Sequence, residues 1–214
     1  RSSDLLKKFS IIGFFSKIMG LLLSKTINYL AKKGFKYPEY INACYLLSRA
    51  ENSEQMINAA LELEKSANKN IASANYKLYF IYSELNTKDP LPFLIAAAQS
   101  NHVKAQYKLG TCYWLGTDKL EQNYELAHDW FTLASRGGDA LSLCSLGIMY
   151  NCNDLTDLQT DQNSHKAYRY TKAAADLGDN LALCTLAQMY EKGCHVEKNL
   201  IKATSLFKQA ASNG

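Results

Sequence analysis

A short motif recurs three times in the second half of the chain, and this repeat restricts the possible folds more than any other feature of the sequence. Each copy has a leucine, a small residue and, after two further positions, a tyrosine. The copies are Leu109-Gly110-x-x-Tyr113, Leu146-Gly147-x-x-Tyr150 and Leu186-Ala187-x-x-Tyr190. Successive copies are shifted by 37 and 40 residues, a period typical of stacked helical hairpins.

A second pattern follows each copy of the motif. It consists of an alanine, a bulky residue three positions later, a pair of small residues and a closing glycine. The copies run from Ala127-x-x-Trp130 to Gly138, from Ala167-x-x-Tyr170 to Gly178, and from Ala203-x-x-Leu206 to Gly214. A degenerate copy of the whole unit, beginning with Ala74, Leu78 and Tyr82, lies earlier in the chain.

Both patterns predict helices that pack on each other. Ala105, Leu109 and Tyr113 are spaced by four residues and therefore share one helical stripe. Small residues on this stripe allow close approach, and the bulky side chain at the Trp130 position is expected to fill the remaining gap. A closing glycine such as Gly138 suits the left-handed backbone that follows many helices. Because neither helix can bury its stripe alone, the units are expected to stack into a solenoid.

The last unit resembles the Sel-like (Sel-one) repeat, a relative of the tetratricopeptide repeat with a longer loop between its helices. The matching residues are Ala182, Leu186-Ala187, Tyr190, Gly193, Val196, Asn199, Lys202-Ala203, Leu206, Gln209-Ala210-Ala211 and Gly214. The resemblance covers roughly residues 70–214. Asn199 stands where the family prefers aspartate, and His195 where it prefers a second glycine. The unit at 105–138 lacks the G-x-G-V loop, and the unit at 142–178 has an enlarged loop expected from Asn151 to Ser164.

The resemblance implies an all-α fold, a right-handed superhelical solenoid of about four to five antiparallel helix pairs. We divide the chain into residues 1–36 and a repeat domain over residues 37–214. The repeats are expected at about 39–70, 71–101, 102–138, 139–178 and 179–214. Helices around 39–50 and 53–68 would form a diverged first pair, because Pro38 favours a helix start immediately after it.

Residues 1–36 are predicted to form an extra amphipathic helix with a basic polar face. Residues 1–38 contain eight basic side chains and one acidic one, whereas the rest of the chain contains 16 basic and 19 acidic ones. The apolar face supplies candidate anchor residues for a membrane or a partner: Phe9, Ile12, Phe15, Met19 and Leu23. Three roles stay open, namely a cap on the solenoid, docking of residues 5–30 to a membrane surface or partner, and a remnant of a targeting segment. Lys17 and Lys25 interrupt the apolar run, which disfavours a membrane-spanning helix.

Six cysteines bear on the cellular compartment. Cys44, Cys112, Cys144 and Cys184 fall in predicted helices, whereas Cys152 and Cys194 fall in predicted loops. No closely spaced cysteine pair occurs, and a helical cysteine usually behaves as a small buried apolar residue. Reduced thiols are therefore expected, with Cys152 and Cys194 as possible exceptions. This favours the cytoplasm, while a membrane-associated or periplasmic location stays open.

No motif for catalysis or cofactor binding is present, so neither an enzyme nor a cofactor is expected. The four histidines lie far apart in the sequence, and Cys194-His195 has no second ligand pair, so no metal site is expected. Asp154, Asp157 and Asp161 lack the glycine and closing glutamate of a calcium-binding loop. The acidic balance of the repeat region argues against a nucleic acid ligand.

The resemblance to tetratricopeptide-like arrays implies a partner-binding groove lined by the first helix of each unit. The residues at these positions are Tyr76, Lys77, Phe80, Lys104, Tyr107, Lys108, Thr111, Trp114, Ser145, Ile148, Asn151, Thr185, Gln188 and Glu191. Tyr107 and Phe80 fit the core equally well. Trp114 is the sharper candidate, because it follows Tyr113 and falls off the core stripe. On this reading, replacing Trp114 by alanine weakens partner binding and leaves the melting temperature nearly unchanged.

We therefore expect a non-enzymatic adaptor or scaffold that binds a protein partner through the concave groove. The partner could be an effector, a toxin or a component of an assembly. The alternative is a bacterial immunity protein that neutralises a cognate toxin by binding it. The abundance of lysine, asparagine and tyrosine fits an AT-rich bacterial genome.

Overall fold

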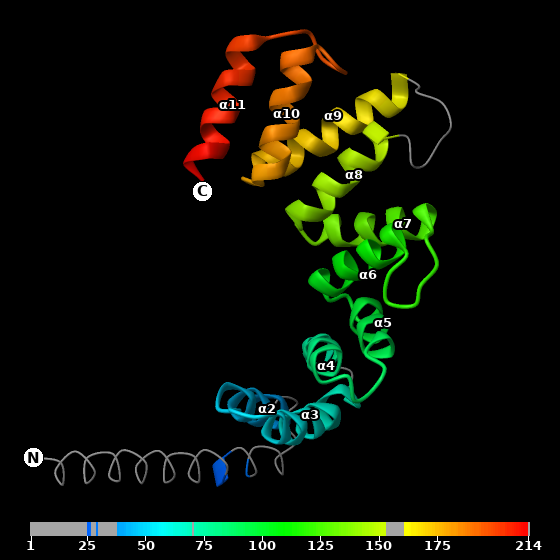
Figure 1. The fold of residues 1–214 in the computed structure, drawn as a ribbon, viewed down its shortest axis with the longest axis vertical. Coiled ribbons are helices and arrows are strands. Elements are labelled where there is room, and N and C mark those ends of the chain that lie inside the picture. The colour runs from blue at the N-terminus through cyan, green and yellow to red at the C-terminus, as the bar shows by residue number, and fades with distance from the viewer. Residues whose placement is uncertain (1–24, 27–28, 30–37, 70, 153–160, 214) are drawn as a thin grey trace, which may run out of the picture. The chain divides into compact units, whose positions relative to one another are not determined.

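The computed structural model describes the chain except for residues 1–24, 27–28, 30–37, 70, 153–160 and 214. Every regular element in the described part is a helix (Figure 1). The helices are α2 (Pro38–Ser48), α3 (Ser53–Ala67), α4 (Ala72–Leu85), α5 (Leu91–Gln99), α6 (Val103–Leu115), α7 (Tyr124–Arg136), α8 (Ala140–Cys152), α9 (Asp161–Asp176), α10 (Asn180–Lys192) and α11 (Leu200–Ser212). The all-α prediction is confirmed. The amphipathic helix predicted over residues 1–36 lies outside the described residues except at positions 25, 26 and 29, and so do all of its anchor residues Phe9, Ile12, Phe15, Met19 and Leu23.

The chain divides into two compact units, residues 1–93 and residues 94–214. In the first unit α2 packs on α3, and α3 packs on α4. The shared core includes Ala43, Leu63 and Leu78, each with no exposed surface. The Tyr82 hydroxyl on α4 donates to the Glu64 carboxylate on α3 at 2.7 Å, so a partly buried hydrogen bond links these two helices.

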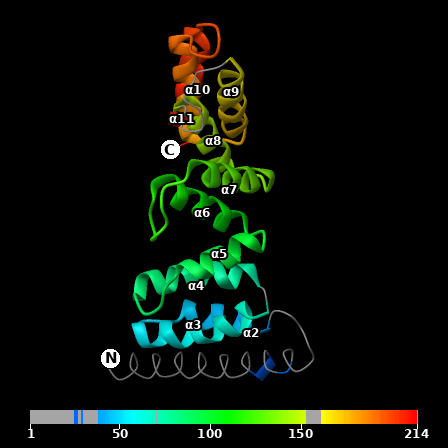
Figure 2. The ribbon, with the colours of Figure 1, turned by 90° about the vertical axis from the view of Figure 1, so that its right-hand side faces the viewer.

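The second unit contains three helical hairpins in succession, α6–α7, α8–α9 and α10–α11 (Figure 2). Within each hairpin the two helices pack closely, and the second helix of one hairpin packs on the first helix of the next. Two contacts at equivalent positions join successive hairpins. The His128 ring on α7 lies 3.0 Å from the Tyr150 hydroxyl on α8, and the Tyr168 hydroxyl on α9 lies 3.2 Å from the Tyr190 hydroxyl on α10. The tyrosine of the repeated motif therefore helps to join neighbouring repeats.

The small residue of the repeated motif lies against the second helix of its own hairpin. A Cβ atom on Gly110 would lie 2.8 Å from the Phe131 ring, and one on Gly147 would lie 2.4 Å from the Thr171 hydroxyl. The gap beside Gly110 is therefore filled by Phe131, the residue after Trp130, and not by Trp130 itself. Thr171 occupies the equivalent position beside Gly147. Phe131 has no exposed surface, whereas Trp130 is partly exposed. The expectation for Trp130 was wrong by one position, because the apolar stripe of α7 runs through Ala127, Phe131 and Ala134.

Helix ends follow the repeat as well. Gly138 and Gly178 adopt left-handed backbone with φ of 83° and 86°, which confirms the role predicted for the closing glycines; Gly214 lies outside the described residues. Asn123 and Asn199 cap α7 and α11 through their side chains. Both ends of the loop expected from Asn151 to Ser164 are helical, since α8 extends to Cys152 and α9 begins at Asp161, and residues 153–160 lie outside the described residues. Among the described helices, none has the length and apolar character needed to cross a membrane.

Candidate protein-interaction surface

Helix α6 has one buried stripe and one solvent-accessible stripe. Its buried residues are Ala105, Gln106, Leu109, Gly110 and Cys112. The five predicted interaction residues on this helix lie outside that stripe: Lys104 is exposed, and Tyr107, Lys108, Thr111 and Trp114 are half-buried. The repeat pattern therefore separates the two faces of α6 as expected. All five predicted residues on α6 retain contact with solvent.

Trp114 lies closer to the core than its sequence position indicated. Its ring meets Phe131 edge to face, with centroids 5.8 Å apart and planes at 85°. Tyr107 also lies 5.8 Å from Phe131, and the backbone carbonyl of Trp114 accepts a hydrogen bond of 2.9 Å from the Gln122 side chain. The indole packs on the cluster formed by Ala127, Phe131, Leu146 and Met149. Trp114 therefore lies off the buried stripe of α6, as expected, but its ring still packs on the core, because Phe131 extends that core to the end of α6.

The predicted residues on α8 and α10 have different environments. Ser145 is only 7% exposed and Ile148 packs on the core, whereas Asn151 is exposed and its side-chain oxygen lies 2.9 Å from Nε2 of His195. On α10 the hydroxyl of Thr185 donates to the carbonyl of Leu181 at 2.8 Å. Gln188 and Glu191 are exposed. Of the predicted interaction residues on α8, only Asn151 and part of Ile148 are therefore accessible to a partner.

Three predicted residues lie on α4 in the first unit. Tyr76 and Phe80 meet edge to face with centroids 5.0 Å apart, and Tyr79 meets Phe80 at the same distance. Phe80 is 48% exposed, and Lys77 is half-buried. The first unit thus presents an aromatic cluster at its surface, and Phe80 is not a core residue. Exposed aromatic side chains of this kind are common in binding surfaces.

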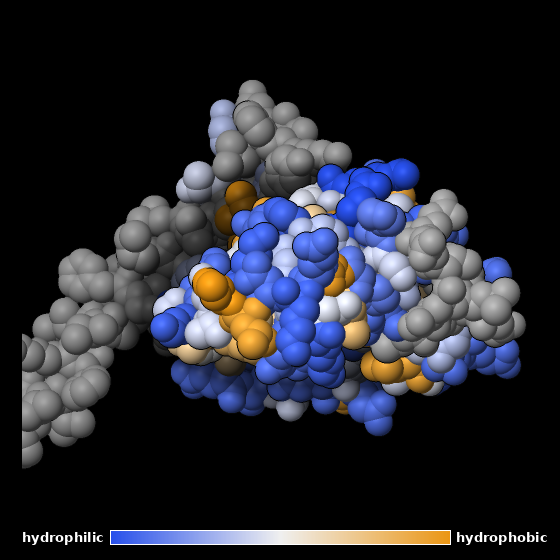
Figure 3. Space-filling model, turned by 90° about the horizontal axis from the view of Figure 1, so that it is seen from above, coloured by the Kyte–Doolittle hydropathy of each residue, from blue (hydrophilic) through white to orange (hydrophobic). Residues whose placement is uncertain are grey.

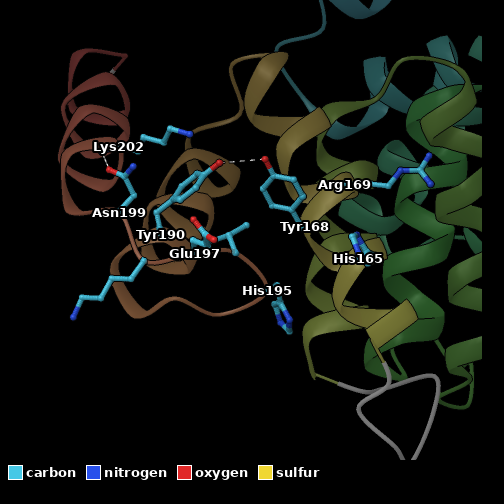
Figure 4. A pocket seen from close by; sticks show the side chains of 10 residues that line it. His165, Tyr168, Arg169, Tyr190, His195, Glu197, Asn199 and Lys202 are labelled. Atoms are coloured by element: carbon cyan, nitrogen blue, oxygen red, sulfur yellow. Dashed lines mark hydrogen bonds between the residues drawn. The ribbon is translucent and has the colours of Figure 1, made fainter.

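A cleft in the last two hairpins was not predicted from the sequence. It has a volume of about 440 Å³ and is lined by α9, the end of α10, the α10–α11 loop and the start of α11 (Figure 4). The lining residues are His165, Tyr168, Arg169, Tyr190, His195, Val196, Glu197, Lys198, Asn199 and Lys202. Hydrogen bonding to Tyr190, together with burial, raises the pKa of Tyr168 to about 12, so the Tyr168 hydroxyl stays protonated at neutral pH.

The sequence contained one signal for this cleft. His195 replaces a family glycine, and its backbone adopts a left-handed φ of 63°. The α10–α11 loop brings the His195 ring to the side chain of Asn151 on α8, 44 residues earlier in the chain. The position of α9 opposite this loop depends on how two hairpins stack, which local sequence patterns do not specify.

The cysteines and histidines do not gather into a reactive site in the described part of the chain. Cys44, Cys112, Cys144, Cys184 and Cys194 form no disulfide. Burial and the nearby Asp118 and Asp179 carboxylates raise the pKa of the Cys112 thiol to about 11 and that of Cys144 to about 12. These two thiols are therefore poor nucleophiles at neutral pH. No group of three or more potential metal ligands occurs among the described residues.

The surface seen in Figure 3 is mainly hydrophilic, with small and separate hydrophobic patches. Exposed apolar side chains in the second unit include Leu141, Leu181, Leu200 and Ile201. Isolated apolar side chains are normal on a protein surface. Polar side chains and half-buried aromatic side chains are therefore better candidates for recognition of a partner than these isolated apolar side chains.

Comparison with known proteins agrees with this architecture. The family model described as Sel1 repeat matches residues 103–139, 140–179 and 180–214. A Sel1 repeat protein from Oxalobacter formigenes has a similar structure, with a TM-score of 0.75 and 22% identity over 92% of this chain and 85% of that one. A protective antigen of uropathogenic Escherichia coli, described as displaying an SLR fold, gives a TM-score of 0.74 and 23% identity over 88% of this chain. The match spans 40% of the length of that antigen.

At these identities the structural matches show the fold alone. An immunity protein from Pseudomonas aeruginosa matches with a TM-score of 0.48 and 16% identity over 89% of this chain and 74% of that one, a likeness too weak to bear on function. No curated protein matches the sequence. Sel1 repeat proteins generally mediate protein–protein interactions and are typically non-enzymatic. The three matched repeats cover just over half of the chain, and the chain belongs to the Sel1 repeat family.

Proposed function

We propose that this chain is a non-enzymatic adaptor that binds a protein partner through the solvent-accessible faces of its first helices, chiefly α6 and α10. One observation carries the proposal. On α6, Tyr107 and Trp114 each present part of an aromatic ring to solvent while the rest of the ring is fixed against Phe131. A rigid, partly exposed aromatic side chain loses little conformational entropy when a partner covers it, which is why such residues dominate binding energies.

Polar side chains beside these rings support the same role. Lys104 and Lys108 lie on the accessible stripe of α6, and Gln188 and Glu191 are exposed on α10. Such groups contribute specificity and the rate of association more than raw affinity. The aromatic cluster around Phe80 on α4 is a further contact surface in the first unit.

Charge-changing variants test the proposal. The tagged chain is used to capture partners from the cells in which it is produced, and the captured proteins are quantified by mass spectrometry. Lys108→Glu on α6 and Gln188→Lys on α10 are expected to lower recovery of the main partner at least tenfold. Lys208→Glu and Gln209→Lys introduce the same chemical changes on the exposed face of α11 and are expected to leave recovery within about twofold of the unmodified chain. Full recovery with both first-helix variants would contradict the proposal.

A further inference from the structure

The cleft between α9 and the α10–α11 loop differs in charge from the repeat region around it. Residues 39–214 contain 16 basic and 19 acidic side chains, so the repeat region is acidic on average. The cleft reverses this balance: Arg169, Lys198 and Lys202 line it, opposed by Glu197. No ion pair among the described residues involves any of these three basic side chains.

The basic groups are arranged around a hydrogen-bonding centre. The ammonium group of Lys202 lies 5.2 Å from the centre of the Tyr190 ring. The Tyr190 hydroxyl lies 3.2 Å from the Tyr168 hydroxyl, and Figure 4 shows the two tyrosines facing each other across the cleft. Arg169 also lines the cleft, but its side chain extends away from this pair in Figure 4. With three basic side chains and one acidic one among its lining residues, the cleft has an excess of positive charge, and Lys202 lies beside its hydrogen-bonding centre.

The chemistry of the cleft indicates the kind of occupant. The tyrosine hydroxyl that is not donating to its neighbour, and the Lys202 ammonium group, can donate hydrogen bonds to a carboxylate, and charge-assisted hydrogen bonds are the strongest of this type. The Tyr190 ring supplies an apolar face for the aliphatic part of a side chain. A volume of about 440 Å³ is within the range of ordinary ligand sites, and its open form suits a short extended segment.

We infer that this cleft is a second docking site that takes an acidic, glutamate- or aspartate-rich segment of a protein partner. The inference relies on the proposed function only for the class of occupant, since Sel1 repeat proteins bind proteins. The site shares no lining residue with the accessible faces of α6 and α10, so the two sites can be tested separately.

The test measures binding of a defined probe to the whole chain. The probe is an eight-residue peptide of alternating glutamate and glycine that carries fluorescein, and the comparison peptide replaces every glutamate by glutamine and carries the same dye. Fluorescence anisotropy is expected to show at least tenfold tighter binding of the acidic peptide. Raising NaCl from about 50 to 300 mM is expected to weaken that binding several-fold, since salt screens exposed charges.

Two matched charge reversals locate the binding. Lys202→Glu lies in the cleft, whereas Lys208→Glu lies on the same helix and outside it. Both change the net charge equally. The first is expected to weaken binding of the acidic peptide at least tenfold and the second by less than threefold, with unchanged circular dichroism for both variants.

Several results would overturn the inference. They are the absence of binding of the acidic peptide, equal binding of the acidic and neutral peptides, and equal losses in the two lysine variants. Tighter binding of single-stranded RNA or of phosphatidylserine vesicles, lost in Lys202→Glu, would assign the cleft to another class of anion. If the acidic peptide does not bind but Lys108→Glu still lowers partner capture, the second docking site is excluded and the proposed function stands.

Discussion

Gly110 on α6 lies directly against the ring of Phe131 on α7. A Cβ atom on Gly110 would approach Cδ1 and Cε1 of Phe131 to 2.8 Å, so alanine at this position requires the ring to move. Phe131 is fully buried in a cluster that includes Leu146 and Met149 of the next hairpin. A change at Gly110 therefore affects the packing within one repeat and the junction with the next.

Gly110→Ala is expected to destabilise the chain by about 1 kcal/mol. Overpacking costs about 1–3 kcal/mol, and this outweighs the gain of about 1 kcal/mol that alanine brings to a helix interior. At the equivalent position in α10, Ala187 faces no such obstacle, because its counterpart Phe207 is 37% exposed. Ala187 itself is fully buried, so Ala187→Gly is expected to destabilise by about 1–2 kcal/mol through the loss of helix propensity and of one buried methyl group. Urea unfolding measures both changes, and a more stable Gly110→Ala chain would show that Phe131 can move aside.

Trp114→Ala is expected to lower stability as well as partner binding. The indole is half-buried and meets Phe131 edge to face, and such an aromatic pair contributes about 0.5–1.5 kcal/mol beyond the area it buries. A loss of about 1–3 kcal/mol is expected in urea unfolding, and Trp114→Phe should recover at least half of it. An alanine variant with unchanged stability would place Trp114 outside the core.

The stability of the first unit is expected to depend on pH through Glu64. Burial raises the pKa of this carboxyl group, but hydrogen bonds from Lys88 and Tyr82 outweigh that effect, so the pKa lies below its ordinary value of 4.5. A carboxyl group with a lowered pKa stabilises the fold above its unfolded pKa, and this contribution is lost as the pH falls through the folded value. Urea unfolding should therefore show stability declining below about pH 5. Glu64→Gln should flatten that decline, and an identical pH dependence in the variant would argue against the bridge.

Two substitutions at His195 test whether this residue adopts left-handed backbone in the α10–α11 loop. Its φ of 63° lies in the left-handed region, which costs a non-glycine residue about 1–2 kcal/mol, while its ring bonds to Asn151. His195→Gly removes the strain and the hydrogen bond together, so its stability should stay within about 1 kcal/mol of the original. His195→Val keeps the strain and loses the bond, and should destabilise by about 2 kcal/mol or more. Equal unfolding midpoints for the two variants would exclude a left-handed His195.

The repeat unit was predictable because it depends on local spacing. The stripe through Ala105, Leu109 and Tyr113 and the turns at Gly138 and Gly178 follow from helix geometry and backbone sterics, and the structure contains them. Local spacing did not predict which of Trp130 and Phe131 packs against α6. Adjacent residues on a helix point about 100° apart, and which of two aromatic neighbours faces the partner helix depends on the rotation of that helix, which packing determines.

The candidate surface was predictable in part for the same reason. The accessible stripe of α6 follows from its periodicity, whereas the burial of Ser145 depends on how α8 sits among its neighbours. The cleft lined by Tyr168, Tyr190 and Lys202 joins two hairpins. Its residues are far apart in the sequence and come together only when the repeats stack, so no single motif encodes it.

Site-specific photo-crosslinking in the native cell tests the central claim most directly. A benzophenone amino acid is placed at Lys104 or Glu191 on the first helices, and at Asp129 or Gln209 on second helices, all exposed positions. One dominant crosslinked protein is expected from both first-helix positions, and little crosslinking from the second-helix positions. Crosslinks to that protein from Asp129 and Gln209, with none from Lys104 or Glu191, would contradict the claim.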